Sequence, residues 1–346
     1  MLDFDLLQQR FTSRYPNHYY TVDSHTQGEP TRLLLGGSAE PAGATMEQKR
    51  QSFMDNFDYL RLLLTSEPRG HRDMFAAAVT EPVSSGADFG LIYMDARRYP
   101  YLCGHGTIGA VTVMVELGLL DYGDGDHTIL IDTPSGPVQA HTRIHGGRVE
   151  SVGIDMVPSF VYKTCCPLDL GSSGEIEIDL VYAGGFFAMI SASSHGIDLK
   201  TADRSELVRL GMAVIEAANS QLTVHHPQRP EVKTVDVAEF HQEKNNGEKS
   251  GSGVVIYGEA HMDRSPCGTG TTAKMTLLHH QGRLEAGESY ANSSPLGTVF
   301  TGRIIEETEI GGFPSIVCRI RASAVITGCH RFVLDSRDPF PTGFLL

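Results

Sequence analysis

Two helix-length stretches of small and apolar residues stand out from the alternating patterns around them. The first spans residues 106–117 and contains one charged residue, Glu116, and the second begins at Gly270. A helix that is apolar on nearly every side belongs in the middle of a core. The β-branched residues of the first stretch form helices poorly in isolation, so burial must stabilise it. We therefore expect each stretch to be a buried central helix.

The segments around these two stretches predict mostly strands. Residues 45–64 and 203–219 have spaced apolar positions among charges, which is typical of amphipathic surface helices. Alternating or short apolar runs between Gly, Pro and Asp turns predict strands at 19–22, 31–35, 75–79, 89–94, 127–132, 137–144, 148–154, 175–182, 186–191, 232–240, 254–258, 298–305, 315–322 and 325–334. Residues 1–20 look like a polar lead-in with no helix predicted, and residues 241–252 form a charged loop. The pattern predicts an α+β protein in which two antiparallel sheets each curl around one central helix.

The two apolar stretches begin in the same way. Cys103-Gly-His-Gly-Thr opens the first and Cys267-Gly-Thr-Gly-Thr opens the second, and each stretch later meets a glycine at the same offset, Gly118 or Gly282. Two similar segments that lie about half a chain length apart indicate two related lobes. We expect one pseudo-symmetric lobe from residues 1–157 and 329–346 and another from residues 158–328. The active site is predicted in the cleft between them.

Composition narrows the class of protein. The chain has 346 residues with 40% hydrophobic and 20% charged residues, as in an ordinary soluble globular protein. Its formal net charge of −14 argues against a nucleic-acid surface, which needs a basic patch. There is no signal-peptide pattern and no run of the roughly 20 apolar residues that span a bilayer, so we expect no membrane association. Six cysteines are too few to imply a disulfide framework, which favours free thiols in the cytoplasm.

A cysteine immediately before a helix has unusual chemistry. The exposed N–H groups and the positive end of the helix dipole favour the thiolate form, and glycines nearby let the backbone approach an anion. Two such turns facing each other would hold a carboxylate and place one sulfur on each side of the adjacent carbon. That arrangement predicts removal of a proton from one face and its return to the other. It describes racemisation of an α-amino acid without a cofactor or a metal.

Other interpretations of these residues are weaker. Gly104-His-Gly-Thr-Ile-Gly109 matches a dinucleotide fingerprint, but the surrounding strands look like meanders and not βαβ units. A zinc site lacks the usual Cys and His spacing. We expect Cys165 and Cys166 to be structural or incidental, and Cys318 and Cys329 to be small buried hydrophobes.

Several motifs together resemble the family of proline racemases and hydroxyproline epimerases. The matching segments are spread over roughly residues 21–346. They are Asp23-Ser-His-Thr-x-Gly-Glu-Pro-Thr-Arg32, Glu67-Pro-Arg-Gly-His71, Cys103-Gly-His-Gly-Thr-Ile-Gly109, Gly184-Gly-x-Phe-Ala188, Asp263-Arg-Ser-Pro-Cys-Gly-Thr-Gly270 and Thr327-Gly328. The resemblance implies a diaminopimelate-epimerase-like fold, no pyridoxal phosphate and a small-molecule substrate. We also predict a homodimer.

The resemblance also implies roles for named residues. Cys103 and Cys267 correspond to the catalytic acid and base, and Asp263 to the acid that holds the ring nitrogen of the substrate. The backbone amides that bind its carboxylate correspond to Gly104, His105, Gly268 and Thr269. Aromatic walls against the ring correspond to Phe75 and Tyr257.

The resemblance leaves the substrate open between related ring amino acids. The second aromatic wall is usually Phe in racemases, and Tyr257 departs from that pattern. The Met74-Phe75 segment looks racemase-like, so proline ranks first and 4-hydroxyproline second. Dehydratases of trans-3-hydroxyproline have Thr at the second cysteine, and Cys267 argues against that activity. A dinucleotide oxidoreductase and a catalytically silent binding protein are the alternatives from other classes.

Overall fold

The computed structural model describes residues 3–244 and 249–345, and the chain folds into two compact units. Unit 1 comprises Met1–Thr26, Pro30–Val152 and Ser323–Leu346, and unit 2 comprises Gln27–Glu29 and Gly153–Ala322. These divisions lie slightly earlier along the chain than the predicted boundaries at 157 and 328. The second lies earlier because the last strand, β17 (Ala324–Val333), pairs along its whole length with β1 (His18–Thr26) of unit 1.

Unit 1 is a curled sheet of mixed direction. Hydrogen bonding joins its strands in the order β17–β1–β2–β3–β4–β5–β6, with parallel pairs at β2–β3 and β4–β5. The bounds of the remaining strands are β2 (Glu29–Gly36), β3 (Phe75–Thr80), β4 (Phe89–Asp95), β5 (Gly125–Thr133), β6 (Gly136–His145) and β7 (Arg148–Asp155). The two parallel pairs correct the expectation of a purely antiparallel sheet. A helix crosses over between the strands of each parallel pair, as that geometry requires.

Unit 2 closes its sheet into a ring. The pairing order is β8–β9–β10–β11–β12–β14–β15–β16, and β16 pairs back to β8. The bounds are β8 (Ser159–Asp169), β9 (Glu175–Tyr182), β10 (Phe186–Ser191), β11 (Val235–Glu243), β12 (Ser250–Tyr257), β13 (His261–Met262), β14 (Ser289–Ser293), β15 (Val299–Ile310) and β16 (Phe313–Ala322). Parallel pairs again occur twice, at β10–β11 and β12–β14. Closure leaves the ring without exposed sheet edges.

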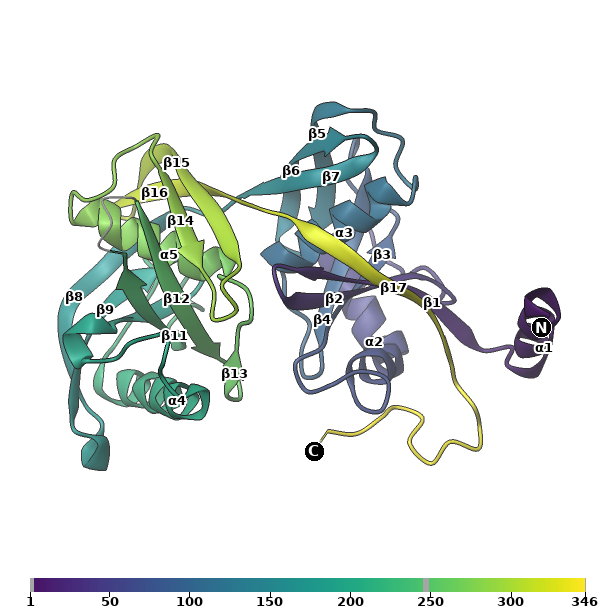
Figure 1. Cartoon of the computed structure of the whole chain (residues 1–346), viewed down its shortest axis with the longest axis horizontal. Helices are drawn as coiled ribbons and strands as arrows, with labels where there is room; N and C mark the ends of the chain where they lie inside the picture. The colour runs from purple at the N-terminus through teal and green to yellow at the C-terminus, as the bar shows by residue number, and fades with distance from the viewer. Residues whose placement is uncertain (1–2, 245–248, 346) are drawn as a thin grey trace. The chain divides into compact units, whose positions relative to one another are not determined.

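Both units have a central helix and an outer helix that connect their parallel strands. The central helices are α3 (Gly104–Glu116) and α5 (Gly268–His280), and the outer ones are α2 (Met46–Thr65) and α4 (Arg204–Gln221). In both units the outer helix connects the first parallel pair and the central helix connects the second. Figure 1 shows α5 among the strands of unit 2 and α4 outside them. The repeat seen in the sequence therefore extends to the order of the elements.

The central helices are buried along most of their length, as the sequence predicts. Residues 106–115 of α3 and 270–278 of α5 are all buried. Threonines tolerate this position because their hydroxyls donate to backbone carbonyls one turn back, as Thr112 does to Ile108 and Thr276 to Thr272. The polar groups of these helices are thus satisfied without water.

Capping side chains begin the outer helices. The N-cap Thr45 accepts a hydrogen bond from the backbone of Gln48 at the start of α2, and Asp203 accepts one from Glu206 at the start of α4. The apolar face of α2 packs on the sheet through Phe53, Leu60 and Leu64. In each unit, the outer helix therefore packs on one face of the sheet and the central helix on the other.

Some predicted elements differ from the structure. The lead-in contains a helix, α1 (Phe4–Arg14), which Asp3 caps. The strands β8 and β14 were not predicted, and two short 3₁₀ turns occur at Gly171–Ser173 and Ser193–His195. The predicted loop 241–252 is partly strand, because β11 runs to Glu243 and β12 begins at Ser250, while residues 245–248 lie outside the described part.

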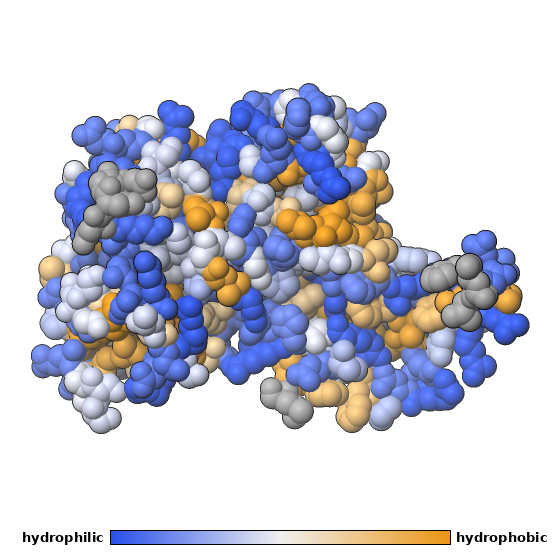
Figure 2. All heavy atoms as spheres, in the orientation of Figure 1, coloured by the Kyte–Doolittle hydropathy of each residue, from blue (hydrophilic) through white to orange (hydrophobic). Residues whose placement is uncertain are grey.

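Hydrophilic side chains cover most of the surface visible in Figure 2, in keeping with the strong net negative charge. The large apolar residues that are exposed come from many separate elements. Within residues 3–244 and 249–345, no helix has both the length and the apolar character needed to cross a bilayer.

Candidate active site

Cys103 is the N-cap of the central helix of unit 1. Its backbone is extended, at φ −145° and ψ 117°, and its side chain does not cap the helix. Its Sγ lies 3.2 Å from Nδ1 of His105, two residues further on. The first N–H groups of a helix have no acceptor within it, so the turn presents amides next to the sulfur. This geometry can hold an anion beside a thiol.

Phe75 packs directly beneath this turn. It begins β3, is buried, and its ring centroid lies 4.7 Å from that of His105 in an edge-on contact. A Cβ at Gly106 would come within 2.8 Å of the Phe75 ring, which is why glycine occupies that position. The structure thus brings Phe75, Cys103, Gly104 and His105 together in unit 1.

Cys267 occupies the same position in unit 2 but has a different backbone. It is the N-cap of α5, and its Sγ accepts a hydrogen bond from the Gly270 amide at 3.3 Å. The Thr269 hydroxyl lies 3.3 Å from the same sulfur, which parallels His105 at Cys103. Burial, followed by the negative charge of Asp263, raises the pKa of the Cys267 thiol well above its ordinary value, against the hydrogen bonds from Thr269 and Gly270. The thiol is therefore the resting form.

The backbone of Cys267 is strained. Its φ of 60° and ψ of 122° lie outside the small left-handed region that L residues tolerate. Strain of this kind costs about 1–3 kcal/mol, and it is found mostly at functional sites. Several contacts hold the turn, including the hydrogen bond from the Cys267 amide to the Ser265 hydroxyl at 3.1 Å.

This strain predicts an unusual order of stabilities. Cys267→Gly should be more stable than Cys267→Ala by about 1 kcal/mol or more, because glycine adopts the backbone without strain. At Cys103, whose backbone is extended, alanine should be the more stable by about 0.4–1 kcal/mol. Urea unfolding of the four variants measures both differences. A Cys267→Ala variant as stable as Cys267→Gly would contradict the strain.

Asp263 lies in a buried cluster of polar groups just before Cys267. Its Oδ1 accepts hydrogen bonds from both the amide and the hydroxyl of Ser265, each at 2.8 Å. Glu29 is buried in the same unit, accepts from the Arg264 amide at 2.9 Å and lies 3.3 Å from Nε2 of His261. Burial and the nearby Glu29 charge raise the pKa of Asp263 to about 7, against the lowering effects of Ser265 and His261. Asp263 therefore changes charge near neutral pH.

Tyr257 is the last residue of β12. Its ring centroid lies 4.5 Å from that of His261, and Tyr257 and Cys267 both pack against the apolar cluster formed by residues such as Phe187 and Val255. The structure thus groups Asp263, Tyr257, Cys267, Gly268 and Thr269 in unit 2.

Sequence reasoning missed several neighbours of these residues. It treated His105 and Thr269 only as backbone amides, although both side chains lie at the cysteine sulfurs. Glu29 and Ser265 belong to recognised motifs, but no signal in the chain indicated that they surround Asp263.

Arg32 of the first motif is structural. It forms a bidentate ion pair with Asp23. It also donates hydrogen bonds to the carbonyls of Leu64 at 2.8 Å and Arg69 at 2.7 Å. The motif around Arg69 is thereby tied to β2.

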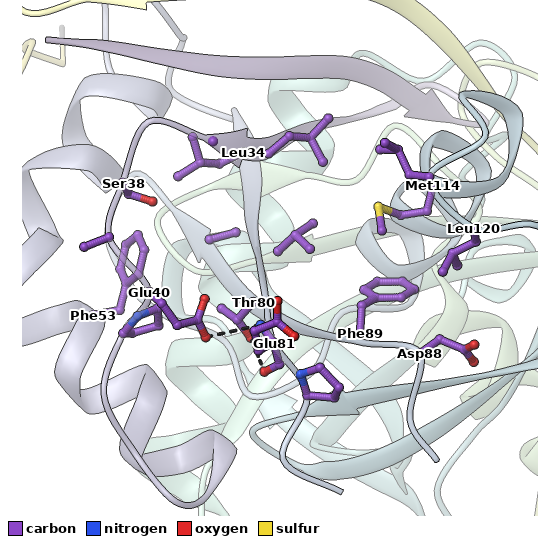
Figure 3. Close-up of a pocket in the computed structure, with 18 residues that line it drawn as sticks. Leu34, Ser38, Glu40, Phe53, Thr80, Glu81, Asp88, Phe89, Met114 and Leu120 are labelled. Carbon is purple, nitrogen blue, oxygen red and sulfur yellow. Dashed lines mark hydrogen bonds between the residues drawn. The ribbon is translucent and has the colours of Figure 1, made fainter. Parts of the chain in front are cut away.

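A cavity of about 330 Å³ in unit 1 lies away from these residues (Figure 3). Apolar side chains such as Leu34, Phe89 and Met114 form much of its lining. Glu40 at its rim accepts from the Glu81 amide and pairs with Lys49. Neither Cys103 nor Phe75 lines the cavity, so we assign it no part in the candidate site.

The other cysteines show no sign of catalysis. Cys166 and Cys318 are buried, and burial raises the pKa of Cys318 to about 12. The prediction that Cys329 is buried is wrong, because it shares the exposed face of β17 with Val325 and Thr327. Cys165 is also exposed. No cluster of three or more metal-ligating side chains occurs among the described residues.

Comparison with known proteins identifies relatives along nearly the whole chain. The family described as proline racemase matches residues 21–345. A proline racemase of Clostridioides difficile is 38% identical over 333 residues, which cover 96% of this chain and 99% of that protein. A 4-hydroxyproline 2-epimerase of Streptosporangium roseum is 38% identical over 95% of this chain and 98% of its own length.

A solved structure extends the comparison to the fold. The crystal structure of a hydroxyproline epimerase from Agrobacterium vitis, with bound trans-4-OH-L-proline, has a TM-score of 0.84 and 28% sequence identity. The match covers 96% of each chain.

Proposed function

Because the chain belongs to the proline racemase family, we propose that it inverts the α-carbon of proline by proton transfer between Cys103 and Cys267, without a cofactor. One observation carries the proposal: in each unit a cysteine occupies the N-cap position of the buried central helix, and its sulfur contacts the side chain of the residue two positions later. The repeated order of strand pairing supports two pseudo-symmetric lobes of the diaminopimelate-epimerase kind. We further propose that the protein is a homodimer and that it acts in the cytoplasm.

In this mechanism the two cysteine turns act on one substrate. The amides of Gly104, His105, Gly268 and Thr269 bind the carboxylate, since helix N-termini attract anions. One sulfur, as thiolate, removes the α-proton, and the other, as thiol, protonates the opposite face. The reverse reaction exchanges these roles, so catalysis needs one thiolate and one thiol together.

Asp263 links substrate binding to the state of Cys267. The proposed ligand of its carboxylate is the ring nitrogen of proline, which enters as a secondary ammonium. Asp263 raises the pKa of Cys267 by charge repulsion. A bound ammonium offsets that charge and lowers the cost of a thiolate at Cys267. The substrate would therefore help to ionise the base that acts on it.

The ring pocket decides between proline and 4-hydroxyproline. Phe75 supplies an apolar wall, and Tyr257 supplies a ring with a hydroxyl. We propose that the Tyr257 hydroxyl points away from the substrate ring. The pocket is then apolar, plain proline is the better substrate, and a ring hydroxyl would lack a partner at a cost of about 1–3 kcal/mol. A Tyr257 hydroxyl that points into the pocket would instead favour hydroxyproline. A planar pyrrole-2-carboxylate should bind more tightly than proline, since it resembles the flattened carbanion of the transition state.

A substrate panel tests this choice. Purified protein is incubated with L-proline, trans-4-hydroxy-L-proline and trans-3-hydroxy-L-proline, and kcat/KM is measured by chiral chromatography for the wild type and Tyr257→Phe. We expect proline to be preferred by about tenfold or more in both proteins. A wild-type preference for hydroxyproline that Tyr257→Phe reverses would make the protein a hydroxyproline 2-epimerase. Turnover of none of the three compounds would reject the proposed function.

A further inference from the structure

Unit 2 contains a buried acid that the proposed mechanism does not use. Glu239 lies on β11 and is fully buried, and neither of its carboxyl oxygens has a hydrogen-bond partner among the described residues. Burying such a group without a partner costs several kcal/mol, so its retention needs an explanation. Burial raises its pKa well above the ordinary value, and this neutral form is the one that can donate a hydrogen bond.

Two glycines make room for this carboxyl group. A Cβ at Gly253 on β12 would lie 2.8 Å from Oε1, and a Cβ at Gly270 on α5 would lie 2.8 Å from Oε2. Gly270 is also the residue whose amide donates to the sulfur of Cys267. The acid therefore lies directly behind the turn that carries Cys267.

The space that Gly253 and Gly270 leave for the Glu239 carboxyl group is called the glycine slot here. Asn292 of β14 lies beside this slot. Its Nδ2 donates to the carbonyl of Pro266 at 3.2 Å and to the hydroxyl of Thr271 at 3.0 Å. Because a carbonyl only accepts, the contact with Pro266 fixes which end of the amide is nitrogen. The other end, Oδ1, is buried without a donor among the described residues, and it lies 3.7 Å from where a Cβ of Gly253 would be. One buried acceptor without a donor and one buried acid without a partner thus both lie beside Gly253.

Pro266 precedes the strained residue Cys267. Its carbonyl accepts from Asn292 and also from the Thr271 hydroxyl at 3.1 Å. A strained backbone persists only where its surroundings over-determine it. Asn292 is one of the groups that does so here.

We propose that Glu239 and Asn292 are a pair of positioning residues for Cys267: Glu239, as a neutral acid, donates to Oδ1 of Asn292, whose amide holds the carbonyl of Pro266. The proposal rests on the catalytic role proposed for Cys267. Lys274 does not replace this donor, because its Nζ contacts Nδ1 of His241 and donates to Glu243 at 2.9 Å. The other titratable groups that interact electrostatically with Glu239 are Cys267, Asp263 and Tyr290.

A comparison of stabilities tests the pair without requiring activity. Cys267→Gly and Cys267→Ala are each made alone, with Asn292→Ala and with Glu239→Met, and their urea midpoints are measured. We expect the difference in urea midpoint between Cys267→Gly and Cys267→Ala to fall to a small fraction of its value in the otherwise unchanged protein when Asn292 or Glu239 is replaced. Glu239→Gln, which keeps an N–H donor of similar shape, should preserve it. An unchanged difference in both the Asn292→Ala and Glu239→Met backgrounds would overturn the proposal.

Kinetics supply a second readout with Cys267 intact. Glu239→Gln should keep kcat within about threefold of the wild type, whereas Glu239→Met, which fills the slot without a donor, should lower kcat about tenfold or more with little change in KM. Equal activity of the Gln and Met variants would also overturn the proposal. If the protein racemises none of the tested amino acids but the stability comparison succeeds, the proposed function fails and the structural role of the pair stands.

Discussion

Replacing Cys103 or Cys267 by serine is expected to lower kcat about 10²–10⁴-fold, the usual contribution of a general acid or base. Serine is itself a good N-cap, so the helix starts of α3 and α5 should persist. Its hydroxyl, however, does not ionise near neutral pH and cannot replace the thiolate. Racemisation is measured in both directions for Cys103→Ser and Cys267→Ser.

The exposed cysteines provide matched controls for these variants. Cys165→Ser and Cys329→Ser make the same chemical change at positions outside the proposed site, and both should retain wild-type kcat. A Cys267→Ser enzyme with near-normal turnover would refute the assignment of two catalytic bases.

Asp263→Asn is expected to lower kcat/KM for proline about 10–150-fold. It replaces a charged hydrogen bond to the substrate nitrogen, worth about 1.5–3 kcal/mol, by a neutral contact. It should also change the pH dependence. Because the pKa of Asp263 is raised to about 7, its carboxylate forms only as pH rises through that value, and wild-type kcat/KM should rise there. The kcat/KM of the variant should not show this rise near pH 7.

The surface variant Asp236→Asn on β11 controls for the loss of one negative charge, and it should leave the pH profile unchanged. An Asp263→Asn enzyme that keeps the rise near pH 7 would show that another group titrates there. In that case Asp263 would not be the ligand of the substrate nitrogen.

Hydrophobic patterning predicted the elements whose burial is nearly uniform. The central helix α3 could be found from its composition because every face of it is covered. The strand β8 could not, because irregularities in its register with β9 near Lys163 break the alternation on which the prediction depends. The polar strand β14 was missed for a related reason. Its inward positions are Tyr290 and Asn292, and Asn292 bonds to the Cys267 turn and not to an apolar core.

The residues of the candidate site were found unequally. Motifs led to the two cysteines and to Asp263, since Gly and Cys at fixed spacing before a helix imply specific chemistry. The contacts of His105 with Cys103, and the glycine slot that holds Glu239, depend on side-chain packing across different strands. Nothing local in the chain indicates that Glu239 is buried, because it stands in an ordinary strand pattern.

The fate of the α-hydrogen tests the central claim most directly. L-proline is converted in D₂O to low extent, and deuterium at the α-carbon is measured separately in the D-product and in the remaining L-substrate. With two different cysteines as acid and base, the D-product should carry solvent deuterium while the remaining substrate keeps its protium. A D-product that retains the substrate's own hydrogen, or a substrate that exchanges as fast as product forms, would contradict the two-base account.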